Sequence, residues 1–281
     1  MQIFKEISPL RAYLNTRRQP PNSVGFVPTM GALHEGHLSL IRAAQKENTL
    51  TVCSIYVNPT QFGNPEDLIK YPRTLDNDLA LLESLKCDVV FCPETDEMYG
   101  SAAPIAIAFP GLDDVLEGEF RPGHFSGVAQ VVAKLFHIVE PDRAYFGQKD
   151  FQQVMVVTRL VEALKFNVTI VPLPIVREAD GLAMSSRNQR LSSVERKKAT
   201  VIYDSLRYTR KKLLEGQGMA DVIEDVRRRC AENQVRLEYL ALADRKTLTL
   251  LDRVKDPRNA VILIAAQVGP VRLIDNLVLE T

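Results

Sequence analysis

The sequence has little of what marks a membrane, secreted or fibrous protein. Its 281 residues include 14 glycines and 16 prolines, too few for a collagen-like or linker-dominated chain. The longest apolar run, residues 260–266, is far short of the ~20 residues that span a bilayer. Near the N-terminus, Lys5, Glu6 and Arg11 interrupt the apolar core that a secretion signal needs. We therefore expect a cytoplasmic protein with no membrane partner.

Cysteine is also scarce, and its spacing forms no motif. The four cysteines, Cys53, Cys87, Cys92 and Cys230, include no Cys-x-x-Cys pair and have no histidine at ligand spacing. A chain of this length buries enough surface to fold without disulfide bonds. We therefore expect four reduced, mostly buried thiols.

The chain has no excess of charge of either sign. Its 35 lysines and arginines balance 35 aspartates and glutamates. Nucleic-acid-binding proteins need a basic surface to neutralise phosphates, so we expect no nucleic-acid partner. Apolar residues make up 46% and charged residues 25%, which is typical of globular chains and excludes disorder. The length predicts one large or two modest domains, at about 150 residues per domain.

Apolar strand-like segments alternate with helical patterns through the first 175 residues. We predict strands at residues 24–27, 51–57, 89–91, 143–146 and 168–171. We predict helices at residues 38–46, 76–86, 127–139 and 151–165. Apolar strands separated by helices form a parallel sheet covered on both faces. The pattern therefore predicts an α/β domain, a Rossmann-like doubly wound parallel sheet, at residues 1–176.

The pattern changes after the loop at residues 177–188. Ser192 and Glu195 have the spacing of a capping box, which predicts one long helix to about Leu214. A second helix is predicted at residues 219–233, and strands at residues 237–242, 260–267 and 271–279. We therefore predict a smaller α+β domain at residues 177–281.

The first candidate site directly follows the strand at residues 24–27. Its sequence is Pro28-Thr29-Met30-Gly31-Ala32-Leu33-His34-Glu35-Gly36-His37. His34 and His37 share one face of a first helical turn, where the free backbone N–H groups favour anions. Two imidazoles at this place suit a polyphosphate. The alternative is a pair of surface or zinc-binding histidines, but zinc would need a third protein ligand.

Two further polar segments follow later strands, at the sheet edge where α/β proteins bind ligands. In Phe146-Gly147-Gln148-Lys149-Asp150, Lys149 offers a charge for a phosphate, although the segment also fits an ordinary helix start. Met184-Ser185-Ser186-Arg187-Asn188 combines hydroxyls, an arginine and backbone amides into a candidate anion clamp. The alternative for this second segment is a plain capped turn between domains.

Together these segments resemble the nucleotidyltransferase superfamily with a His-x-Gly-His motif, whose members split ATP between the α and β phosphates. With Val57-Asn58-Pro59-Thr60-Gln61-Phe62 added, they are similar to the pantothenate synthetase family from Val24 to about Leu191. The resemblance implies ATP-dependent ligation of (R)-pantoate and β-alanine to pantothenate, a step towards coenzyme A. It implies a pantoyl-adenylate intermediate and release of AMP and pyrophosphate.

The resemblance also implies roles for individual residues. The catalytic residues would be His34, His37 and Lys149, with His37 as the proton donor. The nucleotide would be bound by Met30, Gly31, Ala32, Leu33, His34, Glu35, Gly36, His37, Gly147, Gln148, Lys149, Asp150, Val176, Met184, Ser185, Ser186 and Arg187. The substrates would be bound by Gln61 and Gln153 for pantoate, and by Asn58 with Gln61 for β-alanine. Tyr71, Arg121 and His124 fall in segments that resemble the family's walls and gates.

The family further implies Mg²⁺ with ATP, a homodimer, and a C-terminal domain that closes over the active site. Mg²⁺ seldom has an all-protein cage, so we expect the phosphate oxygens to hold it and predict no protein metal site. Two positions depart from the family pattern. Relatives often carry a run of aspartates where this chain has Asp76, Asn77 and Asp78, so Asn77 interrupts that run. Gln148 stands where relatives carry glutamate.

Two other functions fit parts of the sequence. One is a different His-x-Gly-His adenylyltransferase acting on a phosphorylated vitamin precursor, which would have no use for the paired glutamines. The other is a non-catalytic ATP-binding module, which would have little use for both histidines. Neutral charge and modest length disfavour a tRNA-charging enzyme.

Overall fold

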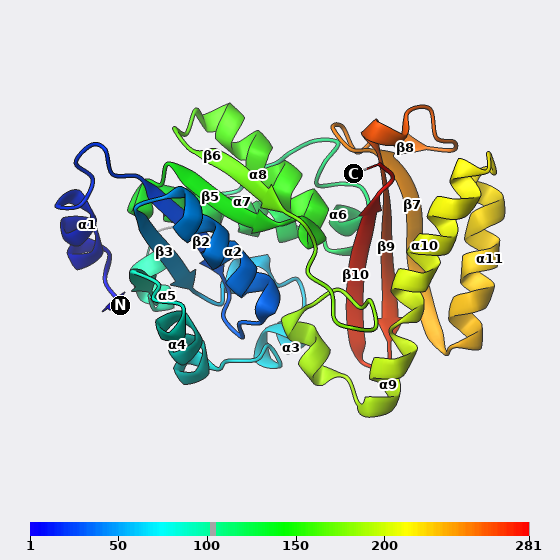
Figure 1. Ribbon diagram of the computed structural model, residues 1–281, viewed down its shortest axis with the longest axis horizontal. Helices are drawn as coiled ribbons and strands as arrows, with labels where there is room; N and C mark the ends of the chain where they lie inside the picture. Colours follow the sequence, from blue (N-terminus) through cyan, green and yellow to red (C-terminus); the bar gives the residue numbers. More distant parts are fainter. Residues whose placement is uncertain (102–104, 281) are drawn as a thin grey trace. The chain divides into compact units, whose positions relative to one another are not determined.

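The computed structural model describes residues 1–101 and 105–280 (Figure 1). The chain divides into two compact units. The first comprises Met1–Gln148 and Gln152–Pro174, and the second comprises Lys149–Phe151 and Ile175–Thr281. The three residues Lys149–Phe151 therefore group with the C-terminal part of the chain.

A six-stranded parallel sheet forms the centre of the first unit. Its order is β1 (Gln2–Phe4), β4 (Val89–Phe91), β3 (Leu50–Ile55), β2 (Val24–Thr29), β5 (Arg143–Gly147) and β6 (Thr169–Leu173). From β2 the chain adds β3 and β4 on one side, then crosses to β5 and β6 on the other. The strand order therefore reverses beside β2, and ligands of doubly wound sheets bind outside the strand ends at such a point.

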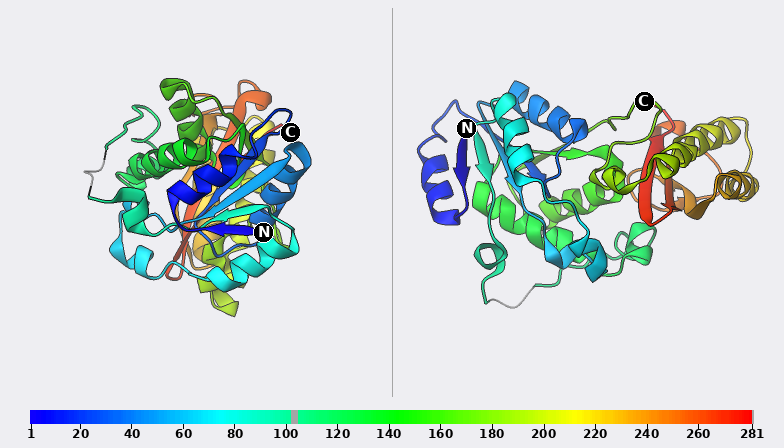
Figure 2. Two further views of the ribbon diagram at one scale, coloured as in Figure 1. Left: turned by 90° about the vertical axis from the view of Figure 1, so that its left-hand side faces the viewer. Right: turned by 90° about the horizontal axis from the view of Figure 1, so that it is seen from below.

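Helices cover both faces of this sheet (Figure 2). Val27 belongs to a buried apolar cluster shared with α2 (Glu35–Glu47) and α4 (Leu75–Ser84). The neighbouring Phe26 side chain contacts Phe136 of α7 (His124–Val139), with ring centroids 6.4 Å apart. Successive side chains of a strand point to opposite faces, so one strand packs on helices from both sides. The predicted α/β class and the doubly wound parallel sheet are confirmed.

Several short elements accompany this framework. They are α1 (Ile7–Asn15), η1 (Pro59–Gln61), α3 (Pro65–Ile69), α5 (Thr95–Tyr99), α6 (Glu117–Phe120) and η2 (Gln148–Asp150). The longer α8 (Phe151–Leu164) follows η2 and begins at the predicted residue. Among the helices of residues 1–101 and 105–280, none is long and apolar enough to cross a membrane.

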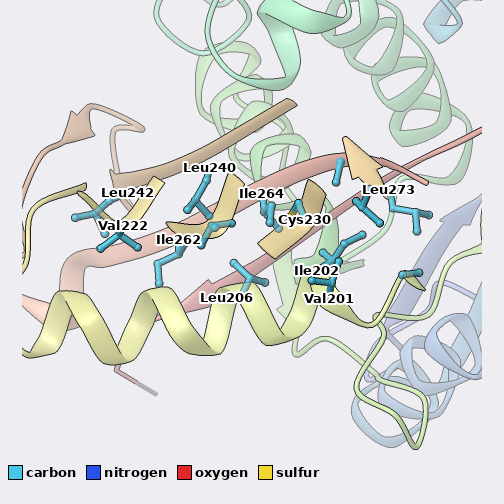
Figure 3. Packing of buried hydrophobic residues seen from close by; sticks show 14 of the residues in the cluster. Val201, Ile202, Leu206, Val222, Cys230, Leu240, Leu242, Ile262, Ile264 and Leu273 are labelled. Carbon is cyan, nitrogen blue, oxygen red and sulfur yellow. The ribbon is translucent and has the colours of Figure 1, made fainter. Parts of the chain in front are cut away.

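The second unit contains a four-stranded antiparallel sheet. Its order is β10 (Val271–Val278), β9 (Ala260–Val268), β7 (Val235–Asp244) and β8 (Leu250–Leu251). The helices α10 (Val201–Leu214) and α11 (Met219–Glu232) pack on it, and Leu206 of α10 points towards Ile262 of β9 (Figure 3). The predicted smaller α+β unit is confirmed.

The prediction of one long helix to Leu214 is wrong. The capping box of Ser192 and Glu195 is present, but it opens only the short α9 (Ser193–Lys198). The Ile202 N–H donates to Ala199 O, three residues earlier, which interrupts the regular helical ladder before α10. Ala199 and Ile202 are both fully buried. Both side chains belong to the apolar core of the second unit.

All four cysteines are free and buried, as predicted. Burial raises the pKa of Cys87 to about 12 and that of Cys92 to about 11. Because the thiolate is the reactive form, the raised pKa lowers the reactivity of these two thiols at neutral pH.

Candidate active site

A buried carboxylate holds the loop that connects β2 to α2. Asp78 of α4 is fully buried, and its two oxygens accept hydrogen bonds from Ala32 N at 2.9 Å and Leu33 N at 2.8 Å. The Thr74 hydroxyl also donates to it, at 3.2 Å. Gly31 has a φ of +76°, and a Cβ there would lie 2.9 Å from Asp78 Oδ2. Glycine at position 31 therefore allows the carboxylate to approach the loop.

The two histidines cap the helix that this loop enters. His34 is the N-cap residue of α2, and its Nδ1 accepts a hydrogen bond from Gly36 N at 3.2 Å. His37 Nδ1 accepts a hydrogen bond from His34 N at 3.4 Å, which completes a reciprocal capping box. The spacing of the motif thus satisfies helix N–H groups that would otherwise lack partners.

This capping also fixes which ring nitrogens carry protons. A neutral imidazole has one donor and one acceptor nitrogen, so the accepting Nδ1 atoms of His34 and His37 place each hydrogen on Nε2. The ring centroids are 4.1 Å apart. Two Nε2–H donors therefore lie together at the positive end of the helix dipole, an arrangement suited to phosphate oxygens.

The segment after β3 forms a second polar cluster of the first unit. The Asn58 amide is buried and donates to Gln61 Oε1 at 3.0 Å and to Gly127 O at 3.2 Å. Its oxygen accepts from the Thr60 hydroxyl at 3.1 Å and from the Tyr99 hydroxyl at 2.7 Å. All four hydrogen-bonding positions of this amide thus have partners within the protein.

Gln61 links this cluster to the loop between β2 and α2, which we call the histidine loop. Its Nε2 donates to the Met30 sulfur at 3.2 Å, and a thioether is a weak acceptor. His124 Nδ1 lies 2.8 Å from Gln61 O, and its Nε2 lies 3.1 Å from the Arg121 guanidinium. Because arginine only donates, the His124 Nε2 accepts and its Nδ1–H donates to Gln61. Gln61 Nε2 is therefore the group of this cluster most readily turned towards a substrate.

Other candidate residues of the first unit are placed as follows. Tyr71 is buried and packs edge-on against Phe62, with ring centroids 5.7 Å apart. Gln153 is partly exposed in the first turn of α8. Gly147 ends β5, and no heavy atom of the described residues would lie within 4 Å of a Cβ there. Packing inside the protein therefore does not require glycine at 147, whereas a closely approaching ligand would.

The remaining candidates lie in the second unit. The Lys149 side chain is 16% exposed, and its ammonium lies 3.6 Å from Asp150 Oδ1. Met184 N donates to Val176 O at 3.0 Å, closing a short hairpin. Ser185 caps η3 (Ser186–Arg190), with its hydroxyl accepting from Arg187 N at 3.3 Å. The candidate anion clamp thus also forms a capped turn, the alternative structure that its sequence allows.

Among the residues that the structure describes, no three His, Cys, Asp or Glu side chains are grouped to hold a metal ion. Asp78, the buried member of the Asp76–Asp78 segment, already accepts from three donors.

Two parts of the site were missed from the sequence. The contact of Asp78 with the backbone at Ala32 and Leu33 was not predicted, and Gly31 was interpreted as allowing the backbone to approach a ligand. Asp275 and Asn276 in β10 contact Arg177 and Lys149, and no local pattern marked them. These residues act through contacts between distant parts of the sequence.

The doubly wound sheet places the His-x-Gly-His helix start beside its strand-order reversal, where such sheets bind ligands. The sequence model of the pantoate-β-alanine ligase family matches residues 2–278. The chain belongs to the pantoate-β-alanine ligase family.

Relatives named pantothenate synthetase match essentially the whole chain. The protein from Moorella thermoacetica is 44% identical and covers 100% of this chain and 99% of its own length. The protein from Aquifex aeolicus is 46% identical, with coverages of 98% and 97%. The pantothenate synthetase structure from Thermus thermophilus is 43% identical, with a TM-score of 0.91 over 100% of both chains.

A second similar structure is a ligand complex. The pantoate-β-alanine ligase from Francisella tularensis is 37% identical, with a TM-score of 0.86, and covers 100% of this chain and 98% of its own. That structure is a complex with β-γ ATP and β-alanine.

Proposed function

We propose that this chain is an ATP-dependent ligase that joins (R)-pantoate and β-alanine into pantothenate. The observation that carries the proposal is the pair of Nε2–H donors of His34 and His37 at the start of α2, in a chain of the pantoate-β-alanine ligase family. Neither a simple ATP-binding module nor a structural capping motif needs two imidazoles with this fixed orientation.

The first step forms the mixed anhydride. A carboxylate oxygen of pantoate attacks the α-phosphorus of ATP, and the bond from that phosphorus to the bridging oxygen breaks. Pyrophosphate leaves with the electron pair. His34 and His37 donate Nε2–H hydrogen bonds to phosphate oxygens as their charge grows, and pyrophosphate leaves as an anion. His37, the proton donor that the resemblance implies, acts in this tautomer by donating a hydrogen bond, since its Nδ1 accepts from His34 N. Such fixed donors stabilise the transition state more than the ground state.

The second step forms the amide. The amine nitrogen of β-alanine attacks the acyl carbon of the pantoyl adenylate, and the bond from that carbon to the phosphate oxygen breaks. AMP leaves with the electron pair, and the nitrogen loses a proton. Gln61 and Gln153 hold pantoate, and Asn58 with Gln61 places β-alanine. Because Asn58 holds Gln61 Oε1, the amide of Gln61 offers its N–H₂ group to substrate oxygens.

The resemblance supplies the rest of the nucleotide site. Lys149 holds the phosphates as a point charge, and Asp150 with Gly147 binds the ribose. Beside the histidine segment, the residues proposed to contact ATP are Met30, Gly31, Ala32, Leu33, Glu35, Gly36, Gln148, Val176, Met184, Ser185, Ser186 and Arg187. The role of this set is to fix ATP for in-line attack and to keep water from the adenylate.

We propose that Mg²⁺ accompanies ATP and is held mainly by phosphate oxygens. When bound, it withdraws charge from the phosphates. Mg²⁺ usually keeps few protein ligands, which supports this proposal. The Asp78 carboxylate also already accepts from Ala32 N and Leu33 N of the histidine loop.

We further propose that the enzyme works in the cytoplasm as a homodimer, with no nucleic-acid or membrane partner. A monomeric mass in light scattering at micromolar concentration would contradict the dimer. Residues 1–176 form the nucleotidyltransferase domain in this proposal, and residues 177–281 form a domain that closes over the active site. Closure predicts that substrates lower the radius of gyration in X-ray scattering.

Pyrophosphate–ATP exchange in the presence of pantoate, with β-alanine left out, tests the proposed function directly. Pantoate-dependent exchange establishes a reversible acyl-adenylate step. Absence of exchange, with ATP still bound in a separate titration, would point to a different acceptor or to a module without turnover.

A further inference from the structure

We propose that Asp275 and Asn276, adjacent residues of β10, are positioning residues that fix two segments of the nucleotide site. One segment is the main chain at Lys149, and the other is the hairpin from Val176 to Met184. This inference rests on the proposed function, since it takes both segments as parts of the nucleotide site. Both segments and β10 belong to the second unit.

Asn276 holds the lysine segment. Its side chain is buried, and its Nδ2 donates to Lys149 O at 2.9 Å. Register pairing with Leu263 of β9 fixes the backbone of Asn276 within the sheet. The Asn276 N–H also donates to Asp275 Oδ1 at 2.8 Å. The main chain that carries the lysine is thus anchored to a sheet, so the ammonium projects from a fixed point.

Asp275 holds the hairpin through Arg177. The Asp275 carboxylate accepts from both terminal nitrogens of Arg177, at 2.6 and 3.0 Å. The guanidinium also donates to Gly181 O at 3.0 Å and to Asn276 O at 3.3 Å. It lies over the Tyr203 ring, 3.9 Å from the centroid. One side chain therefore ties the turn of the hairpin to β10.

The hairpin also contains two residues that are proposed to contact the nucleotide. Arg177 and Ala183 form a β-bridge, and Met184 N donates to Val176 O at 3.0 Å. Val176 and Met184 are the chain neighbours of that bridged pair. Fixing Arg177 therefore fixes both nucleotide-lining residues at once.

Stability alone is a poor explanation for this arrangement. The Asp275 side chain is 1% exposed and that of Arg177 is 17% exposed. Buried ion pairs typically give no more stability than apolar residues of similar size. A bidentate pair does fix geometry, because the planar fork of arginine matches the carboxylate in one orientation.

A double-mutant cycle on nucleotide affinity tests the Asn276 link. Calorimetric titration with β,γ-methylene ATP gives Kd for the wild type, Asn276→Ala, Lys149→Ala and the double variant. We expect Asn276→Ala to raise Kd about fivefold to tenfold in the wild-type background and less than twofold in the Lys149→Ala background, because neighbouring groups that act through one another are not additive. Asn233→Ala is the matched control, since its Nδ2 also donates to a backbone carbonyl at 2.9 Å, that of Arg229, and it should leave Kd unchanged.

Asp275→Asn tests the other link. It removes one acceptor of the Arg177 fork, and it should raise Kd by a similar factor in both the wild-type and the Lys149→Ala backgrounds, because it acts through the hairpin. Where Asp275→Asn does not fold, Arg177→Lys replaces it, keeping the charge but not the fork. Where Asn276→Ala does not fold, Asn276→Thr replaces it, since threonine suits a strand.

The outcomes separate this inference from the proposed function. The positioning role is overturned if Asn276→Ala raises Kd by the same factor in the wild-type and Lys149→Ala backgrounds. It is also overturned if either β10 variant binds the analogue with wild-type affinity. Both conclusions hold even if pantoate-dependent exchange is normal. If exchange fails but the analogue binds, the proposed reaction falls while the cycle still decides the role of β10. A wild-type chain that binds no analogue would overturn both.

Discussion

Replacing Asp78 with asparagine changes one buried oxygen into an amino group, at the point where two backbone N–H groups converge. The asparagine oxygen can accept from Ala32 N or from Leu33 N, but not from both with the present geometry. The amino group then faces the other N–H, and a buried donor loses its acceptor. The strained loop, in which Gly31 and Ala32 both have positive φ, loses the contact that holds it.

The structure allows the size of the effect to be worked out. A buried donor without a partner costs about 1–3 kcal/mol, and the loss of the charge weakens the two remaining hydrogen bonds by roughly 1 kcal/mol each. We therefore expect the free energy of unfolding to fall by about 3–5 kcal/mol. At about 2–4 °C per kcal/mol, the melting temperature falls by about 6 to 20 °C.

Thermal melting by circular dichroism measures this directly, and Asp76→Asn is the matched control. Asp76 lies in the same first turn of α4 but is exposed, so its loss removes only a helix-dipole interaction of about 0.3–1 kcal/mol. If Asp78→Asn melts within 2 °C of the wild type, the carboxylate does not hold the histidine loop and the reasoning is refuted.

Three further predictions follow from the site and the core. His37→Ala and Lys149→Ala should each lower kcat by about two decades or more with folding retained, because each removes a transition-state contact; unchanged turnover in both would refute the site. Gly127→Ala should lower the urea midpoint, because its Cβ would lie 2.3 Å from a backbone oxygen of η1, and an unchanged midpoint would contradict this close approach. Ellman's reagent at pH 8 should label less than one thiol per native chain within minutes and all four after unfolding, since burial raises the pKa of thiols such as Cys92 to about 11. Rapid labelling of the native chain would contradict that burial.

The central strands were predictable because buried parallel strands consist of continuous apolar runs. The strand at residues 89–91 has the predicted bounds, and β5 extends the predicted strand by one residue. β1 was missed, because its first two residues are exposed and it becomes a strand only by pairing Gln2 with Val89. The local sequence pattern does not indicate a pairing between residues so far apart in the chain.

The break between α9 and α10 was missed for a related reason. Ala199 and Thr200 are compatible with a continuous helix in the local sequence, and both have helical backbone angles. The interruption comes from burial against the sheet of the second unit, which single-segment propensity does not describe.

In the candidate site, too, local features were predicted and long-range contacts were missed. The histidine motif was found because its chemistry and its capping both lie within four consecutive residues. Asp78 and Asn276 act on partners 45 and 127 positions away, Leu33 and Lys149 respectively. The candidate binding residues form local motifs, whereas the residues that contact and place them are found only through the fold.

The grouping of Lys149–Phe151 with the C-terminal part makes the second unit of this chain discontinuous in sequence. A fragment that begins at residue 175 would lack the main-chain oxygen of Lys149 that the buried Asn276 amide contacts. Such a fragment would leave that amide donor without its partner, at a cost of about 1–3 kcal/mol.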